Sequence, residues 1–272
     1  TREAISKKYN SKDKDNSNKE KKFKKITLMV PCYNEEQGIG KVIDEIPVEK
    51  LNHAGFKIEV LVVDNNSKDR TVEIAKSKGA RVVTAPIQGK GSAIKTGFNS
   101  LPADVDYIVM VDGDGTYKTS EILRVIEPLD SGFCDVVVGS RLEGKMVGHS
   151  MSTSHRLANW LFTFLTRRLY TNANVTDTCT GYFAWTKQAI DTLNGHIESK
   201  GFAIESEMIS KMSRLKLRIF SVPITYEPRA GETKSKLRPV SDALKIIWML
   251  FKNTRWKPKT EGKEEKEKEE SE

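Results

Sequence analysis

Five short apolar runs, each followed by a helix-like stretch or a turn, restrict the fold of this chain more than any other feature. The runs are ITLMV (26–30), VLVV (60–63), RVVTA (81–85), YIVMV (107–111) and DVVVG (135–139). Near-continuous apolar strands of this length are typical of a parallel sheet that is buried on both faces. The pattern therefore predicts an α/β fold: a doubly wound, mostly parallel sheet with helices on both faces.

The rhythm of the sequence changes after residue 150. We expect a long helix over 153–170, a loop over 171–180, a strand over 181–186, a helix near 203–214, a strand over 218–226 and a last helix over 239–251. The last helix carries apolar residues on one face, with Lys245 and Lys252 beside them; these apolar residues are Leu244, Ile247, Trp248 and Phe251.

Charge separates the two ends of the chain from its middle. Residues 1–25 hold ten Lys or Arg against four acids, and residues 257–272 hold five against seven. Such charged ends are typical of solvated, disordered segments. An α/β fold of about 200–250 residues commonly forms one domain. We therefore expect a basic flexible arm over 1–25, a single domain over 26–256 and a charged tail over 257–272.

Two further features bear on where the protein works. The longest apolar run, from Ile246 to Phe251, has six residues, whereas about 20 are needed to cross a bilayer. The three cysteines, Cys32, Cys134 and Cys179, are too few and too scattered for a disulfide framework or a zinc site. We therefore expect no transmembrane helix and a reducing, cytoplasmic environment.

The fourth apolar run ends on two like charges. Asp112 and Asp114 flank Gly113, and Gly115 follows. In an open parallel sheet, ligands bind at the carboxyl ends of the strands, and adjacent carboxylates repel each other unless a cation lies between them. An all-oxygen site favours a hard ion such as Mg²⁺ or Mn²⁺, which can also hold a diphosphate. The alternative is an ordinary Asp-Gly surface turn.

Other strand ends carry residues that suit a nucleotide. They are VPCYNEE (30–36), VVDNNSKDRT (62–71), QGKGSAIKTG (88–97) and VGSR (138–141). Glu35 and Asp64 can accept hydrogen bonds from ribose hydroxyls or a base edge, while Lys90 and Arg141 offer charge to phosphate. Each has an ordinary alternative role: Asp64 as a helix cap, Lys90 as a loop charge and Arg141 as a surface ion pair. No Walker loop or GxGxxG motif is present, and Tyr117 occupies the position where an EF-hand needs glycine.

With VDGDGTY (111–117), DTCTGYFAWTK (177–187) and RAGETKSKL (229–237), these stretches follow one another over about residues 26 to 251. In this combination the chain resembles family 2 glycosyltransferases, which have the GT-A (nucleotide-diphospho-sugar transferase) fold. Among them it is most similar to the polyprenyl (dolichyl) phosphate sugar synthases.

The resemblance implies an inverting enzyme of glycan or glycoprotein assembly. Its donor would be a nucleotide sugar, with UDP-GlcNAc or UDP-Glc favoured over GDP-Man, and its acceptor dolichyl or polyprenyl phosphate. It also implies a nucleotide-binding half over 26–141 and an acceptor half over 142–256. Nucleic acid is not an expected partner.

The resemblance also assigns residues to the site. The donor pocket would contain Pro31, Tyr33, Glu35, Asp64, Asn66, Lys90, Gly91 and Asp112. Mg²⁺ or Mn²⁺ would bind Asp112 and Asp114, and phosphate would contact Arg141, Arg229 and Lys236.

The sequence departs from the family pattern at two points. Thr116 occupies the position where relatives often have a second oxygen ligand, commonly Gln. The C-terminal membrane helices of many relatives are absent, so we expect a peripheral contact with the cytoplasmic face of a membrane.

The acceptor decides which catalytic groups are needed. A lipid monophosphate is already largely a dianion at neutral pH and needs no strong base. A sugar hydroxyl would need one, and Asp177, Glu205 and Glu207 are the candidates. Three readings stay open: a lipid-phosphate glycosyltransferase, a transferase of the same fold acting on a glycan or small acceptor, and a non-catalytic sugar-nucleotide-binding protein.

Overall fold

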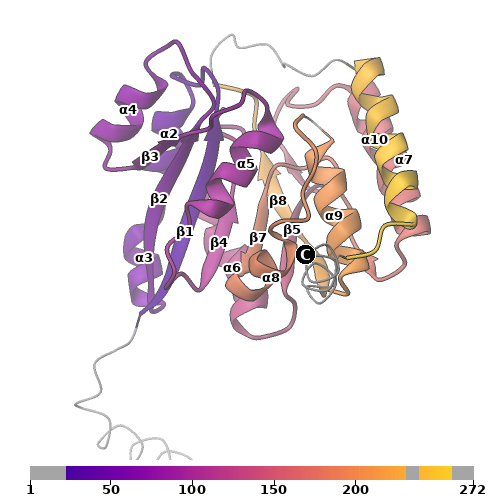
Figure 1. The fold of residues 1–272 in the computed structure, drawn as a ribbon. Helices are drawn as coiled ribbons and strands as arrows, with labels where there is room; N and C mark the ends of the chain where they lie inside the picture. The colour runs from indigo at the N-terminus through magenta and orange to yellow at the C-terminus, as the bar shows by residue number, and fades with distance from the viewer. Residues whose placement is uncertain (1–22, 202, 231–238, 259–272) are drawn as a thin grey trace, which may run out of the picture.

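A computed structural model of the chain describes residues 23–201, 203–230 and 239–258, and Figure 1 shows its fold. The strands are β1 (Lys24–Cys32), β2 (Phe56–Asp64), β3 (Arg81–Thr84), β4 (Tyr107–Met110), β5 (Val136–Met146), β6 (Ala173–Asn174), β7 (Phe183–Thr186) and β8 (Ile219–Tyr226). The helices are α2 (Ile39–Asp44), α3 (Val48–His53), α4 (Thr71–Ser77), α5 (Lys90–Asn99), the 3₁₀ turn η1 (Thr119–Glu121), α6 (Ile122–Asp130), α7 (Thr153–Leu169), α8 (Lys187–Leu193), α9 (Ile204–Arg214) and α10 (Pro239–Thr254).

The eight strands form one sheet in the order β3-β2-β1-β4-β7-β5-β8-β6. β7 runs antiparallel to both of its neighbours, β4 and β5, and the other paired strands are parallel. The sheet is therefore mostly parallel, as the apolar runs predicted. The antiparallel strand lies between β4 and β5, directly beside the strand that leads into Asp112.

Side chains of alternate residues in β1 enter two different apolar cores. Leu28 and Val30 pack with α2, α3, α4 and α6 on one face, whereas Met29 packs with α5 and the C-terminal helices on the other. Both faces are covered because each strand is apolar on both sides, which is the reason that a parallel sheet needs helices on each face. Figure 1 shows these helices flanking the sheet.

The predicted elements agree with the structure in type and order, except that the loop expected over 171–180 contains the two-residue strand β6. Each of the five apolar runs lies within or overlaps one of the first five strands, and the helices expected over 153–170, near 203–214 and over 239–251 correspond to α7, α9 and α10. The fold class, a doubly wound and mostly parallel α/β sheet with helices on both faces, is confirmed. The sequence patterns did not indicate the short helices α2, α3 and α8, because a helix of one or two turns has too few residues to show a period.

No helix in the described part of the chain is long and apolar enough to cross a membrane. The proposed basic arm and charged tail fall almost wholly outside the described residues, as does Lys236.

Candidate active site

A cavity of about 280 Å³ lies at the carboxyl ends of the central strands. Residues that are distant in sequence meet here because parallel strands end at the same edge of the sheet. The lining residues are Pro31, Cys32, Tyr33, Glu35, Asn65, Gln88, Gly89, Lys90, Ala93, Asp112, Gly113, Asp114 and Arg229. The pocket thus brings carboxylates and cationic side chains together within a partly apolar wall.

The two aspartates that follow β4 both face this pocket, and glycines allow the close packing around them. A Cβ atom at Gly181 would lie 2.4 Å from Asp112 Oδ2, and one at Gly113 would lie 2.4 Å from Cys32 Sγ. Side chains larger than hydrogen at these positions would displace the aspartate loop. The Asp-Gly-Asp segment is therefore packed into the sheet edge, unlike a surface turn.

Asp114 is held by its own loop and by a distant arginine. Its Oδ1 accepts hydrogen bonds from the backbone N–H (3.1 Å) and the hydroxyl (2.6 Å) of Thr116. Its Oδ2 lies 2.9 Å from a terminal nitrogen of Arg229. Burial lowers the pKa of Arg229, but the carboxylates of Asp114 and Glu35 more than offset this and raise it above its ordinary value. Arg229 therefore stays charged where it lines the pocket.

Lys90, which also lines the pocket, forms ion pairs with two carboxylates. Its Nζ lies 2.7 Å from Asp112 Oδ1 and 2.6 Å from Glu205 Oε1. Burial lowers the pKa of Lys90, but these two carboxylates raise it well above its ordinary value. Burial raises the pKa of Glu205 above its usual range, although Lys90 opposes this effect. Lys90 is thus a permanent positive charge next to Asp112.

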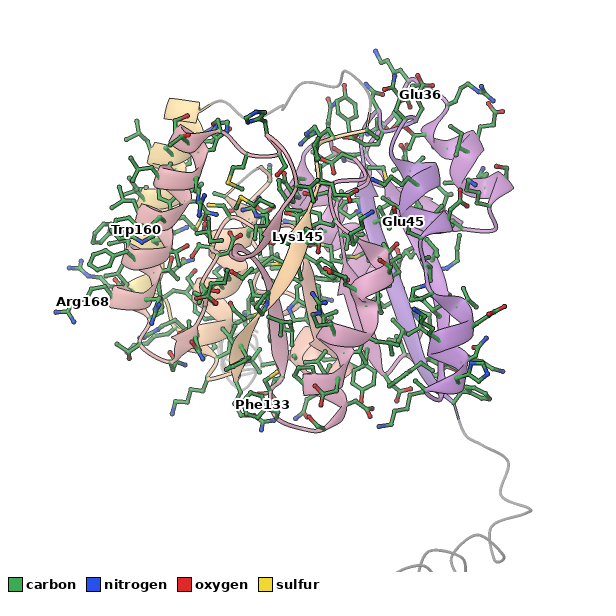
Figure 2. The ribbon with its side chains drawn as sticks, turned by 180° about the vertical axis from the view of Figure 1, so that it is seen from behind. Glu36, Glu45, Phe133, Lys145, Trp160 and Arg168 are labelled. Atoms are coloured by element: carbon green, nitrogen blue, oxygen red, sulfur yellow. The ribbon has the colours of Figure 1, made fainter. Side chains whose placement is uncertain are left out.

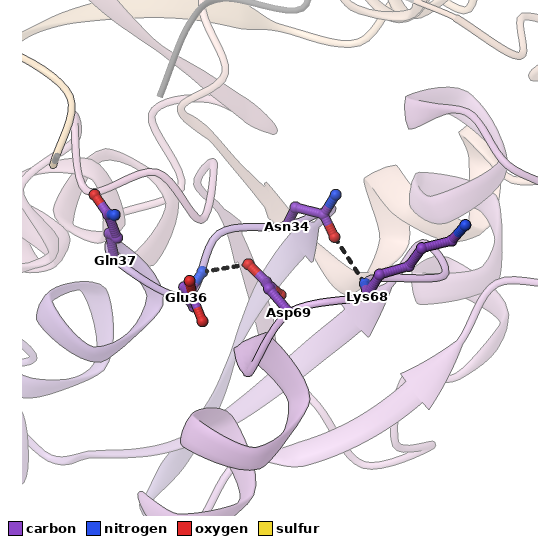
Figure 3. A pocket seen from close by; sticks show the side chains of 5 residues that line it. All are labelled: Asn34, Glu36, Gln37, Lys68 and Asp69. Carbon is purple, nitrogen blue, oxygen red and sulfur yellow. Dashed lines mark hydrogen bonds between the residues drawn. The ribbon is translucent and has the colours of Figure 1, made fainter. Parts of the chain in front are cut away.

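The loops after β1 and β2 are joined by backbone and side-chain hydrogen bonds. Asn34 adopts a left-handed conformation (φ 53°), and its side-chain oxygen accepts the backbone N–H of Lys68 at 2.7 Å. The carboxylate of Asp69 accepts the backbone N–H of Glu36 at 3.1 Å. Figure 3 shows these contacts in a second pocket, which Gln37 also lines. The connection fixes the loop that carries Tyr33 and Glu35.

Asp64 and Asn66 organise the second loop from within. The Asp64 carboxylate accepts the backbone N–H groups of Asn66 and Ser67, while the Asn66 amide donates to Ala85 O at 3.2 Å. Asn65, which lies between them, lines the main pocket and accepts the backbone N–H of Gly89 at 2.6 Å. No pattern in the sequence singled out Asn65 from its neighbours.

Arg141 and Asp177 form a buried ion pair outside the lining of the pocket. Arg141 Nε and Nη2 donate to the two oxygens of Asp177 at 2.8 and 2.9 Å, and Asn159 donates to Asp177 Oδ1 at 2.7 Å. Arg141 Nη2 also donates to Cys179 O. Asp177 is fully buried and both its oxygens accept hydrogen bonds, so the geometry favours a role in holding Arg141 over a role as a base.

The sequence-predicted site residues thus separate into groups. Pro31, Tyr33, Glu35, Lys90, Asp112, Asp114 and Arg229 line the main pocket. Asp64, Asn66, Gly91, Arg141, Asp177 and Glu205 lie outside its lining, although Glu205 contacts the pocket through Lys90. Glu207 is fully buried and lies 2.7 Å from Lys211 Nζ. Lys236 lies outside the described residues.

Two helices at one edge of the molecule each carry exposed apolar side chains. α7 and α10 pack together, and the Tyr170 hydroxyl donates to Leu250 O at 2.6 Å. The exposed residues are Leu157, Trp160, Leu161 and Phe164 on α7 and Leu244, Trp248 and Phe251 on α10. Ile247, which was expected on this face, is half-buried against the core. Figure 2 shows Trp160 and Arg168 pointing away from the sheet.

Comparisons with known proteins agree with this picture. A family model described as glycosyl transferase family 2 matches residues 27–193. An undecaprenyl-phosphate mannosyltransferase of Micrococcus luteus is 31% identical over 247 residues, covering 85% of this chain and 96% of the relative. A dolichyl-phosphate hexose transferase of Haloferax volcanii is 32% identical over 212 residues, covering 78% and 87%.

A solved structure shares the fold. It is a glucosyl-3-phosphoglycerate synthase from Mycobacterium tuberculosis in complex with Mn²⁺, uridine diphosphate and glucosyl-3-phosphoglycerate. The TM-score is 0.64 at 22% sequence identity, over 87% of this chain and 82% of the other.

Proposed function

This chain belongs to glycosyl transferase family 2, and from that premise we propose that it transfers a sugar from a nucleoside diphosphate to a polyprenyl phosphate such as dolichyl phosphate. The observation that carries the proposal is the pocket in which Asp112 and Asp114 face Lys90 and Arg229. Alternating negative and positive groups suit a ligand that brings both a diphosphate and a metal ion.

The donor would bind along the loops that follow β1, β2 and β3. Tyr33 and Asn65 line this side of the pocket and offer a ring and an amide to the nucleoside. Lys90 would face the diphosphate, since a lysine ammonium is a compact charge that suits phosphate oxygens. We propose UDP-GlcNAc or UDP-Glc as the favoured donors and GDP-Man as the alternative.

The two aspartates suit a divalent ion that is held partly by the substrate. The described residues contain no group of three or more His, Cys, Asp or Glu that could hold a metal on their own. Mg²⁺ commonly binds one or two carboxylates together with substrate phosphates and water, so the pair Asp112 and Asp114 fits Mg²⁺ or Mn²⁺. When bound, the ion would neutralise negative charge on the diphosphate leaving group.

The acceptor phosphate would attack the sugar without help from a protein base. Its oxygen forms a bond to C1 while the bond from C1 to the diphosphate oxygen breaks, and a single displacement inverts the configuration. The phosphate is largely a dianion at neutral pH, so the enzyme has to bring two anions together. Arg229, which lines the pocket, would reduce their repulsion.

The exposed faces of α7 and α10 would hold the enzyme against the bilayer that contains the acceptor. A polyprenyl chain cannot leave lipid cheaply, since each CH₂ exposed to water costs about 0.8 kcal/mol. α7 has no Asp or Glu and carries Arg167 and Arg168 in its last turn. The single acid of α10, Asp242, is buried. Aromatic side chains flanked by cations suit the headgroup layer of an anionic membrane.

Product analysis tests the proposal directly. The protein is incubated with Mg²⁺ or Mn²⁺, a panel of UDP- and GDP-sugars and a polyprenyl phosphate, and the lipid fraction is analysed by mass spectrometry. We expect one donor to give a polyprenyl-phosphate sugar. A product formed only on a water-soluble glycan would favour the soluble-acceptor reading, and nucleotide binding without any product would favour the non-catalytic one.

A further inference from the structure

A buried ion pair on α9 has no part in the transfer reaction described above. Glu207 and Lys211 are both fully buried, and Lys211 Nζ lies 2.7 Å from Glu207 Oε1. Taking two charges out of water is costly, and such a pair is retained only where further hydrogen bonds satisfy it. The partners of Glu207 and Lys211 therefore indicate what the pair does.

Both side chains bind the same loop, residues 196–200. Glu207 accepts the backbone N–H of Glu198 at 2.9 Å and that of Ser199 at 2.7 Å. Lys211 donates to the backbone carbonyl of His196 and lies 3.1 Å from the carboxylate of Glu198. The pair thus holds the backbone of the loop at three of the four positions from 196 to 199.

The same loop contacts the turn that carries Lys90. Gly91 donates its backbone N–H to Lys200 O at 3.1 Å. A Cβ atom at Gly91 would lie 2.0 Å from Ser199 O, and one at Gly89 would lie 2.2 Å from Lys200 O. Gly89 also has a φ of 138°, a conformation that side chains rarely adopt. The two backbones are therefore in direct contact on both sides of Lys90.

We infer that Glu207 is a positioning residue for Lys90: by holding loop 196–200 against Gly89 and Gly91, it keeps the Lys90 ammonium between Asp112 and Glu205. The inference rests on the proposed function, which gives Lys90 the donor diphosphate as its ligand. Asn65 holds the turn from the opposite side through Gly89 N–H. The turn that carries Lys90 is thus held by the loop after β2 and by the loop before α9, which are distant in sequence.

The variant Glu207→Gln tests this inference. The amide keeps the size of the carboxylate but accepts only at one end, so one loop N–H loses its partner. Lys211 also loses its fully buried counter-charge and keeps only the partly exposed carboxylate of Glu198. Binding of UDP and of GDP is titrated calorimetrically in Mg²⁺ for the wild type and each variant. We expect the Kd of the nucleotide that binds to rise at least tenfold in Glu207→Gln.

Two controls separate positioning from general destabilisation. Ile209→Ala shortens a fully buried core residue of the same helix and should lower the Tm while changing the Kd less than twofold. In a Lys90→Ala background, Glu207→Gln should add less than a twofold effect, because a residue that acts through Lys90 has nothing left to position. Equal effects in both backgrounds, or an equal rise in Kd for Ile209→Ala, would overturn the inference.

Hydrogen exchange gives a readout that needs no ligand. The Gly91 amide should exchange faster in Glu207→Gln than in Ile209→Ala. Unchanged protection of Gly91 would refute the positioning role of Glu207, even if no nucleotide binds. If the wild type binds neither UDP nor GDP, the proposed donor is wrong, whereas the positioning role of Glu207 is still tested by hydrogen exchange. If Glu207→Gln does not fold, Gly91→Ala disturbs the same contact from the other side and should show the same loss of affinity.

Discussion

Replacing two exposed aromatics on α10 should release the protein from anionic membranes. Trp248 and Phe251 expose 59% and 53% of their surfaces, which corresponds to roughly 110 Å² each if an aromatic side chain offers about 200 Å². At about 25 cal/mol per Å², full burial in lipid would contribute about 3 kcal/mol per side chain. If docking buries half of this area, the double variant Trp248→Glu/Phe251→Glu loses about 3 kcal/mol.

A loss of that size lowers the membrane partition coefficient about 100-fold. Flotation with vesicles of phosphatidylcholine and phosphatidylglycerol measures it, and the same samples are assayed for transfer to polyprenyl phosphate. Binding and lipid glycosylation should fall together, while nucleotide affinity stays unchanged. Binding should also weaken at high salt, because dissolved ions screen the attraction between the flanking cations and the anionic headgroups.

Phe133→Glu provides a matched control. Phe133 exposes 59% of its surface but follows α6 in the chain, and Figure 2 shows it at a different edge of the molecule from Trp160 on α7. Its variant should therefore float like the wild type. A second double variant, Trp160→Glu/Phe164→Glu, should behave like the α10 variant because these residues are exposed to a similar degree. Unimpaired flotation of both double variants would refute the docking argument, and a dimer that they abolish in solution would identify a second copy as the occupant of this face.

Three further predictions concern the reaction. Asp114→Asn keeps the side-chain volume and should abolish metal-dependent transfer while the circular dichroism melt shifts by only a few degrees; full activity in Mg²⁺ or Mn²⁺ would remove Asp114 from the metal site. Arg229→Ala should slow transfer by about 2–4 kcal/mol of transition-state stabilisation with little change in nucleotide Kd, and an equal loss in both would assign Arg229 to the donor. With a lipid phosphate acceptor, kcat/KM should rise with pH through about 6 and then level off, because the dianion attacks. Glu205→Gln should keep that rise; its disappearance would assign the ionisation to Glu205, whose pKa burial raises.

Much of the fold could be read from local patterns. A strand buried on both faces needs consecutive apolar residues, so runs such as ITLMV and YIVMV identify themselves wherever they occur. The order of strands in the sheet is not local in this way. The insertion of β7 between β4 and β5 depends on the packing of segments more than 40 residues apart, and no period in the sequence encodes it.

Part of the pocket could also be predicted from local patterns. Residues that end parallel strands must meet at one edge, so Glu35, Lys90, Asp112 and Asp114 could be grouped without a structure, and all four line the pocket. Asn65 was missed because its role depends on reaching Gly89 N–H, a contact that nothing in the sequence around either residue reveals.

By itself, then, the sequence determined the type of sheet, the edge at which a ligand would bind and the chemical character of the residues gathered there. Only the tertiary structure decided which of the charged residues meet. It pairs Arg141 with Asp177, Arg229 with Asp114 and Glu207 with Lys211, and so separates charges that face the pocket from those that hold its walls. The physical reason is that the role of an ion pair depends on its burial and its partners, and contacts between segments distant in sequence set both. The periodicity of a sequence indicates only which way a side chain faces.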